Sequence, residues 1–116
     1  MLPMRPELLK GHLDALLLAA LESGPQHGYA VIEALRSSSG GALDLPTGTV
    51  YPALHRLQRA GLIAGEEHVV SGRRRRAYHL TAAGHAALGE QRAVWDQFST
   101  AVTAVLSGRP LSTAPA

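Results

Sequence analysis

Four consecutive arginines, Arg73 to Arg76, are the feature that most restricts how this chain can fold. They follow a Ser71-Gly72 pair, which predicts a tight turn between two extended segments. A strand points alternate side chains to opposite faces, so two of the arginines would enter the interior whichever face packed inward. We therefore expect this arm of a β-hairpin to project into solvent.

The segment before the hairpin predicts a helix of about four turns. Thr47 and Thr49 offer hydroxyls that can cap its start, and Gly61 can end it with a positive φ. Apolar residues recur between these ends at helical spacing: Val50, Leu54 and Leu57. A helix followed by a projecting basic hairpin is a winged helix, and its natural partner is a polyanion.

The positive charge is concentrated in this same stretch. The chain has 116 residues and a net charge of +2. Between Thr47 and Thr81, six arginines oppose only Glu66 and Glu67, which gives +4, so the five basic and seven acidic residues elsewhere give −2. The length predicts one domain, and the charge distribution favours an acidic partner for the helix and hairpin.

Cysteine usage and hydropathy exclude several other classes. The chain has no cysteine, so disulfides and thiolate metal sites are absent. Asp14 and Glu22 bracket the longest apolar run, which is too short to span a membrane. We therefore expect a cytoplasmic protein with no membrane segment.

Two further helices are predicted before the helix that starts at Thr47. The first runs from Glu7 to Ser23 with a broad leucine stripe that indicates two contact surfaces, one for the core and one for a partner. The second opens at His27-Gly28-Tyr29 and ends in the loop 37–41. Leu43 to Leu45 predicts a short extended piece that could add a third strand to the hairpin.

A last helix of about 25 residues is predicted to begin after a Thr81 cap and to end before Gly108. Its apolar residues follow a heptad pattern with Gln91 as a polar interruption: Leu88, Trp95 and Val102, with Phe98 and Val105 between. This seam needs another apolar surface, and the first helix of a second copy is the simplest one. We therefore expect a homodimer.

The predicted fold is mainly α (α+β), a winged helix-turn-helix with a two-stranded basic wing and a long C-terminal dimerisation helix. The expected boundaries are 7–80 for the DNA-binding domain and 81–106 for the dimerisation helix. Residues 1–6 and 107–116 are expected to be flexible termini.

Three runs of sequence resemble the PadR family of bacterial transcriptional regulators, particularly its short members with a single C-terminal helix. They are LLKGHLDALLLAALESGPQHGYAV from residue 8, TGTVYPALHRLQRAGLI from residue 47 and SGRRRRAYHLTAAG from residue 71. The resemblance covers residues 8–106. It implies a homodimeric repressor that binds a palindromic operator in double-stranded DNA and controls detoxification, drug-efflux or phenolic-acid stress genes.

A recognition helix enters the major groove with its N-terminal turns, which makes Thr47, Thr49, Tyr51, His55 and Arg56 the candidate DNA contacts. Hydroxyls at a helix start favour phosphates, so the two threonines predict backbone contacts, with plain capping as the alternative. Tyr51 or His55 is expected to touch base edges. A core position is the alternative for Tyr51.

The wing arginines Arg73, Arg74, Arg75 and Arg76 predict contacts with a phosphate backbone or a minor groove. Four like charges on a short arm repel one another unless such a partner accepts them. The alternative is a solvated charge run.

Trp95 has two interpretations. It could be plain dimer core, or, as the resemblance implies, it could stack on a planar aromatic effector in an apolar pocket at the dimer centre, with Phe98 helping to line that pocket. The predicted dimer interface and effector site therefore consists of five residues: Leu13, Leu88, Trp95, Phe98 and Val102.

Enzymatic readings find little support. The six histidines never fall at the four-residue helical step of zinc sites, and no phosphate loop or nucleophile elbow occurs. We therefore expect no catalytic activity, no metal and no cofactor. The alternative function is a winged-helix protein-protein interaction module without sequence-specific DNA binding. Confinement of six arginines to the helix and wing favours DNA.

Overall fold

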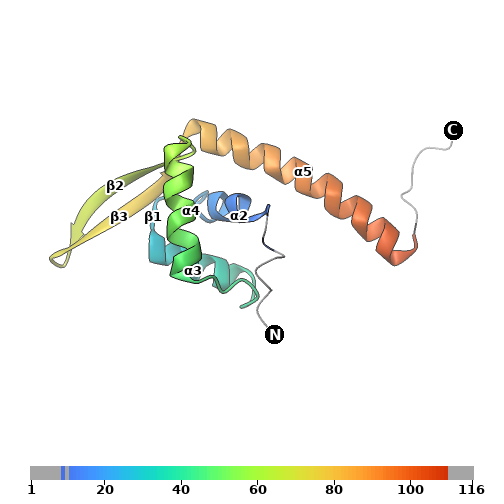
Figure 1. Cartoon of the computed structure of the whole chain (residues 1–116), viewed down its shortest axis with the longest axis horizontal. Helices are drawn as coiled ribbons and strands as arrows, with labels where there is room; N and C mark the ends of the chain where they lie inside the picture. The colour runs from blue at the N-terminus through green and yellow to red at the C-terminus, as the bar shows by residue number, and fades with distance from the viewer. Residues whose placement is uncertain (1–8, 10, 110–116) are drawn as a thin grey trace.

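The computed structural model describes Leu9 and residues 11–109 (Figure 1). Its helices are α2 (Leu13–Ala20), α3 (Gly28–Ser38), α4 (Thr47–Arg59) and α5 (Ala82–Ser107). Its strands are β1 (Gln26–His27), β2 (Ile63–Val70) and β3 (Arg73–Leu80). The termini predicted to be flexible are 1–6 and 107–116. Of these, residues 1–6 and 110–116 lie outside the described residues, whereas Ser107 is the last residue of α5 and Gly108 is its C-cap.

One apolar core joins α2, α3 and α4 to the inner end of the sheet. Its largest fully buried side chains come from all of these elements: Leu17, Leu18, Leu21, Val31, Val50, Leu54, Leu57 and Ile63. Burial of each such side chain contributes about 1.5–3 kcal/mol. Within the described residues no polar or charged residue is fully buried. The three helices and the sheet therefore form a winged helix, as the sequence predicts.

The hairpin projects from this core. β2 and β3 pair antiparallel from Ile63 opposite Leu80 to Val70 opposite Arg73. Only the inner end, with Ile63, Tyr78 and Leu80, is buried. The turn has positive φ at both Ser71 (52°) and Gly72 (77°), as tight two-residue hairpin turns require. The expectation that the arginine arm projects into solvent is confirmed.

A third strand exists, but not where the sequence predicts it. β1 is the strand that pairs with β3, through Gln26 opposite Tyr78 and His27 opposite Ala77. Residues 43–45 form no strand, and Leu45 is instead buried in the core. A strand of two residues is too short to show an alternating pattern in the sequence. It forms only because β3 lies beside it.

Two predicted helix starts also need correction. Gly11 has φ of 85°, a left-handed conformation that interrupts the helix expected from Glu7, so α2 begins only at Leu13. α4 has Pro46 as its N-cap and no side-chain cap, so the expected capping by Thr47 and Thr49 is wrong. The fixed φ of proline already suits a helix start.

The beginning of α5 is anchored to the connection between α4 and β2. The predicted Thr81 cap is confirmed, since its hydroxyl accepts a hydrogen bond from the Gly84 amide at 3.1 Å. The same hydroxyl donates to the Gly61 carbonyl at 2.6 Å, and the Thr81 amide donates to the Leu62 carbonyl at 3.1 Å. A Cβ on Gly84 would lie 1.9 Å from the Leu62 oxygen. Only glycine permits this approach.

Beyond its contacts with α2, α5 extends away from the body (Figure 1). The Cα radius of gyration is 16.8 Å, against about 13 Å for a compact domain of this length.

No helix in the described part of the chain is both long and apolar enough to cross a membrane.

We predict that Gly84→Ala destabilises the fold by about 1–3 kcal/mol, because the new methyl group overlaps a backbone carbonyl that cannot rotate away. Gly89→Ala is the matched control, since a Cβ at Gly89 in the same helix meets nothing within 4 Å. That control should be stabilising by about 0.5–1 kcal/mol. Urea unfolding of both variants measures the difference, and equal stabilities would contradict the close contact.

Candidate nucleic-acid interface and apolar groove

The outer face of α4 forms a continuous exposed ridge. Val50, Ala53, Leu54 and Leu57 are buried on the inner side of the helix. At about 100° per residue, the positions opposite them are the exposed Gly48, Pro52, His55 and Arg59, which we call the α4 ridge. A helix presenting such a ridge fits the major groove of B-DNA, which is about 12 Å wide.

The start of α4 is open to an anion. Thr47 and Thr49 are both exposed, and no side chain caps the helix. The first amides of a helix lack intrahelical partners, and the helix dipole adds positive potential there. A Cβ at Gly48 would meet nothing within 4 Å, so the backbone can be approached closely. Both threonine hydroxyls lie where a phosphate at this terminus could accept their hydrogen bonds.

Tyr51 packs mainly as a structural residue. It is half-buried against the core, and a Cβ on Gly28 would lie only 2.6 Å from its Cε1 atom. Burial raises the pKa of the Tyr78 phenol, and Tyr51 raises it further against the opposing effect of Arg76. The ring of Tyr51 is therefore partly packed against the core, and its contact with base edges stays a prediction. The close approach of the Tyr51 ring also explains why the first residue of α3 is a glycine.

Arg56 and His55 differ in surroundings although they are adjacent. His55 lies exposed on the α4 ridge. Arg56, at the side of the ridge, forms an ion pair with Asp14 of α2. The sequence offers no sign of this pair, because 42 residues separate its members.

All four wing arginines are exposed, but they are not equivalent. Arg76 lies 3.4 Å from the Gln58 side-chain oxygen and 3.6 Å from a Glu67 carboxylate oxygen. Its stem passes over Gly65, where a Cβ would lie 2.9 Å from the Arg76 Cδ. Arg73, Arg74 and Arg75 form no ion pair with any described residue. Three guanidinium groups are therefore unpaired, and one is held against α4.

The sequence-based list of contacts omitted Arg59. It is exposed on the α4 ridge and makes no ion pair within the described part of the chain. Its helical position could have been found from the sequence, because Arg59 lies seven residues after Pro52, on the side opposite Val50, Leu54 and Leu57.

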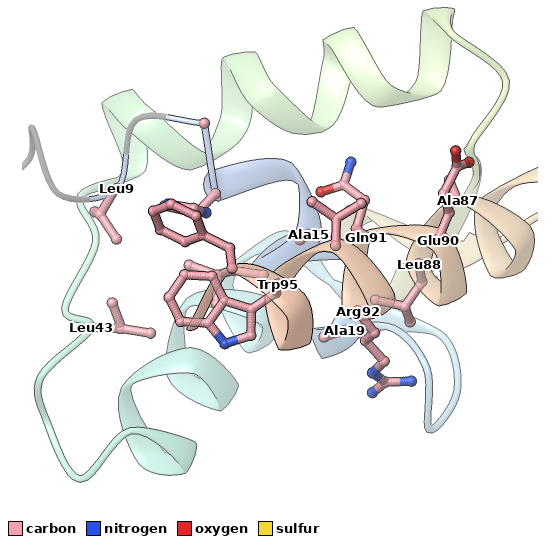
Figure 2. A pocket seen from close by; sticks show the side chains of 15 residues that line it. Leu9, Ala15, Ala19, Leu43, Ala87, Leu88, Glu90, Gln91, Arg92 and Trp95 are labelled. Atoms are coloured by element: carbon pink, nitrogen blue, oxygen red, sulfur yellow. The ribbon is translucent and has the colours of Figure 1, made fainter. Parts of the chain in front are cut away.

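A concave surface lies between α2 and α5, apart from the α4 ridge, with a volume of about 830 Å³ (Figure 2). Small residues such as Ala15 and Ala19 line it from α2, and Leu88, Trp95 and Phe98 line it from α5. The structure brings these three predicted residues of α5 together. It does not bring in the other two, because Leu13 packs against the core and Val102 lies further along α5.

Aromatic and ionic contacts fix α5 against α2 along this groove. The Trp95 ring is 50% exposed and meets the His12 ring edge-on at a centroid distance of 5.1 Å. Phe98 follows at 6.2 Å. Two Arg92 nitrogens each donate to the Glu22 carboxylate at 2.7 Å, and this pairing lowers the pKa of the Glu22 carboxyl. The groove therefore has a defined shape within one chain.

Three of the six histidines lie in separate places. His12 adjoins Trp95, His55 lies on the α4 ridge, and His68 is 3.8 Å from Glu66 on the wing. Among the residues that the structure describes, no group of three or more His, Cys, Asp or Glu side chains could hold a metal ion.

A helix with an uncapped start and an exposed ridge, beside a projecting basic hairpin, defines the chain as a winged helix-turn-helix protein of the DNA-binding class. Residues 17–90 match the PadR-like family of transcriptional regulators. The match covers more than half of the chain, and the chain belongs to this family. PadR regulators bind DNA and act in transcriptional regulation, not as enzymes.

Individual relatives agree with this assignment. The chain is 49% identical over 55 residues to the transcriptional regulator Rv3488 of Mycobacterium tuberculosis, a match covering 47% of this chain and 51% of that protein. It thus spans about half the length of this curated relative. A PadR family regulator from Eggerthella lenta is 31% identical, with TM-score 0.76 and 86% of each chain covered. A PadR-like regulator from Bacillus cereus is also 31% identical, with TM-score 0.75 and coverage of 86% and 96%.

We expect the triple variant Arg73→Ala, Arg74→Ala, Arg75→Ala to flatten the salt dependence of DNA binding. If each unpaired guanidinium neutralises one phosphate, the slope of log K against log [salt] falls by about 2.7 per bound protomer. Arg76→Ala should change the slope much less, because Arg76 already faces Glu67. Fluorescence anisotropy titrations between about 50 and 200 mM salt measure this. If Arg76→Ala lowers the slope by as much as one third of the triple variant's effect, Arg76 does not differ from the other three arginines.

Proposed function

We propose that the protein is a homodimeric repressor that binds a palindromic operator and is released from it by a planar aromatic effector. The observation that carries this proposal is the unshielded apolar side of α5. Phe98 is 56% exposed, Val105 79% and Leu106 81%, on a helix that extends away from the body. Monomeric proteins rarely leave such a surface uncovered, and a second copy is its simplest cover.

Dimerisation through α5 would give the DNA-binding surface its symmetry. A two-fold axis at the α5 seam presents two α4 ridges and two wings to one duplex. Two recognition helices read successive major grooves when they lie about 34 Å apart, or a multiple of that distance. The matching target is a palindrome with one half-site for each protomer.

The groove between α2 and α5 supports the effector part of the proposal. Its volume of about 830 Å³ lies in the range of small-molecule sites. Trp95 leaves half of its surface free there, with Phe98 beside it. A flat aromatic ligand can stack on the indole and displace apolar contacts of the seam. From family membership, the controlled genes are expected to serve detoxification, drug efflux or phenolic-acid stress.

We predict that Val105→Asp converts the dimer to a monomer, because a carboxylate in an apolar seam would be desolvated without a partner. Val69→Asp is the matched control, since Val69 is 73% exposed on the wing against 79% for Val105. Sedimentation velocity at micromolar concentration distinguishes the two forms. A wild-type monomer, or a dimer that survives Val105→Asp, would exclude the α5 seam as the interface.

The effector part is tested with Trp95, which is the only tryptophan. Planar aromatic compounds should quench its fluorescence and weaken operator binding by about 5- to 150-fold, the usual range of allosteric coupling. Trp95→Leu should abolish the weakening while keeping DNA binding itself. If compounds quench Trp95 without affecting the operator complex, the groove binds ligands but does not regulate.

A further inference from the structure

The ion pair between Asp14 and Arg56 places a negative charge beside the recognition helix. Arg56 follows His55 of the α4 ridge, and its side chain is 52% exposed. Asp14 reaches it from α2. Asp14 belongs neither to the core nor to the groove lining. A carboxylate at this position opposes a polyanion, so its presence on a DNA-binding surface needs an explanation.

We propose that Asp14 is an affinity-determining residue that competes with DNA phosphate for Arg56. This inference rests on the proposed mode of DNA binding through α4. In the free protein the carboxylate neutralises the guanidinium. When DNA binds, a phosphate replaces the carboxylate at Arg56. Asp14 thereby lowers the affinity of the protein for DNA of any sequence, the operator included.

The exposure of the pair makes this exchange feasible. An ion pair between exposed side chains is weak, equivalent to a factor of about 1.4 to 5 in an equilibrium constant. The pair is therefore strong enough to reduce affinity measurably and weak enough to be broken on DNA.

Arg56 also occupies a suitable position for a phosphate contact. It lies at one side of the α4 ridge, and Gln58, near Arg76 of the wing, lies toward the other side. The sides of a recognition helix face the two phosphate backbones that border the major groove. An arginine there contributes affinity for all sequences more than preference among them.

The test is a double-mutant cycle with Asp14→Asn, which preserves side-chain size, and Arg56→Gln, which removes the positive charge but keeps a polar side chain. Asp14→Asn should raise operator affinity by about 2- to 25-fold for a dimer, the square of the single-pair factor. In Arg56→Gln protein the same change should have no such effect on affinity. Thermal unfolding of each variant verifies that the fold is retained.

The salt dependence gives an independent readout. When a phosphate replaces the carboxylate at Arg56, one ion pair replaces another, so the net number of ions released to solvent does not change. A permanently unpaired Arg56 instead binds the duplex as a free cation and releases a DNA counterion. Asp14→Asn should therefore steepen the slope of log K against log [salt] by up to about 0.9 per protomer. This steepening should disappear in the Arg56→Gln background.

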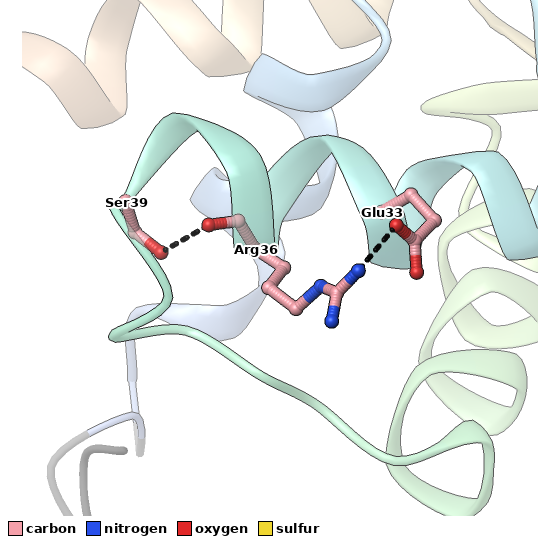
Figure 3. Close-up of polar contacts among 3 residues, drawn as sticks. All are labelled: Glu33, Arg36 and Ser39. Carbon is pink, nitrogen blue, oxygen red and sulfur yellow. Dashed lines mark hydrogen bonds and ion pairs between the residues drawn. The ribbon is translucent and has the colours of Figure 1, made fainter. Parts of the chain in front are cut away.

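Glu33→Gln is the matched charge control. Glu33 pairs with Arg36 at 2.8 Å within α3 (Figure 3), and the two side chains are 43% and 51% exposed, close to the Asp14–Arg56 pair. The variant makes the same change in net charge without affecting Arg56. We expect its effect on affinity and slope to be clearly smaller than that of Asp14→Asn.

Three results would overturn the proposal: no gain from Asp14→Asn, a gain that persists in Arg56→Gln protein, or an equal gain from Glu33→Gln. The second would show through-space repulsion, and the third a net-charge effect. If the wild-type protein does not bind duplex DNA through α4, the proposed function fails instead. The two failures are thus distinguishable.

Discussion

The contact between Gly84 and the Leu62 carbonyl determines how the two functional halves of the molecule are joined. Gly84 lies in the first turn of α5, and Leu62 follows the end of α4, so the direction of the long helix is set where the recognition helix stops. Thr81 reinforces the contact with hydrogen bonds to both sides of it. Because a backbone carbonyl at this distance leaves no room for a side chain, α5 cannot tilt there without disturbing the wing. In a dimer built on α5, the same contact would fix the separation of the two α4 ridges.

Most of the fold follows from local sequence signals. The spacing of Val50, Leu54 and Leu57 predicts α4 correctly, and the Thr81 cap correctly places the start of α5. The projection of the hairpin follows because two of the four consecutive arginines would otherwise be buried. Local signals failed where backbone conformation or tertiary contact decided the outcome. The left-handed Gly11 shortened the first helix, and the two residues of β1 became a strand only because β3 lies beside them.

The candidate site was less predictable than the fold, because the role of a charged side chain depends on what lies across from it. Sequence treats all six arginines of the helix and wing alike. The structure separates Arg56, paired with Asp14, and Arg76, held by Glu67 and Gln58, from the four without ion-pair partners among the described residues. These partners come from elements that sequence spacing cannot relate to one another. In contrast, the helical period alone would have placed Arg59 on the exposed ridge.

The short helix α2 connects the groove with the recognition helix within a single protomer. Ala15, Leu16 and Ala19 line the groove, while Asp14 points to the other side of α2, toward Arg56. An eight-residue helix is only about 12 Å long, so its two faces hold a fixed relation to each other. A ligand that prefers a displaced α2 would therefore change the Asp14–Arg56 pair directly, by no more than its difference in affinity for the two positions. In the proposed dimer, a change in the spacing of the two α4 ridges would require both protomers to respond together. Coupling through α2 would need no such joint response. A ligand in one groove would then alter the contact of one protomer with its own DNA half-site.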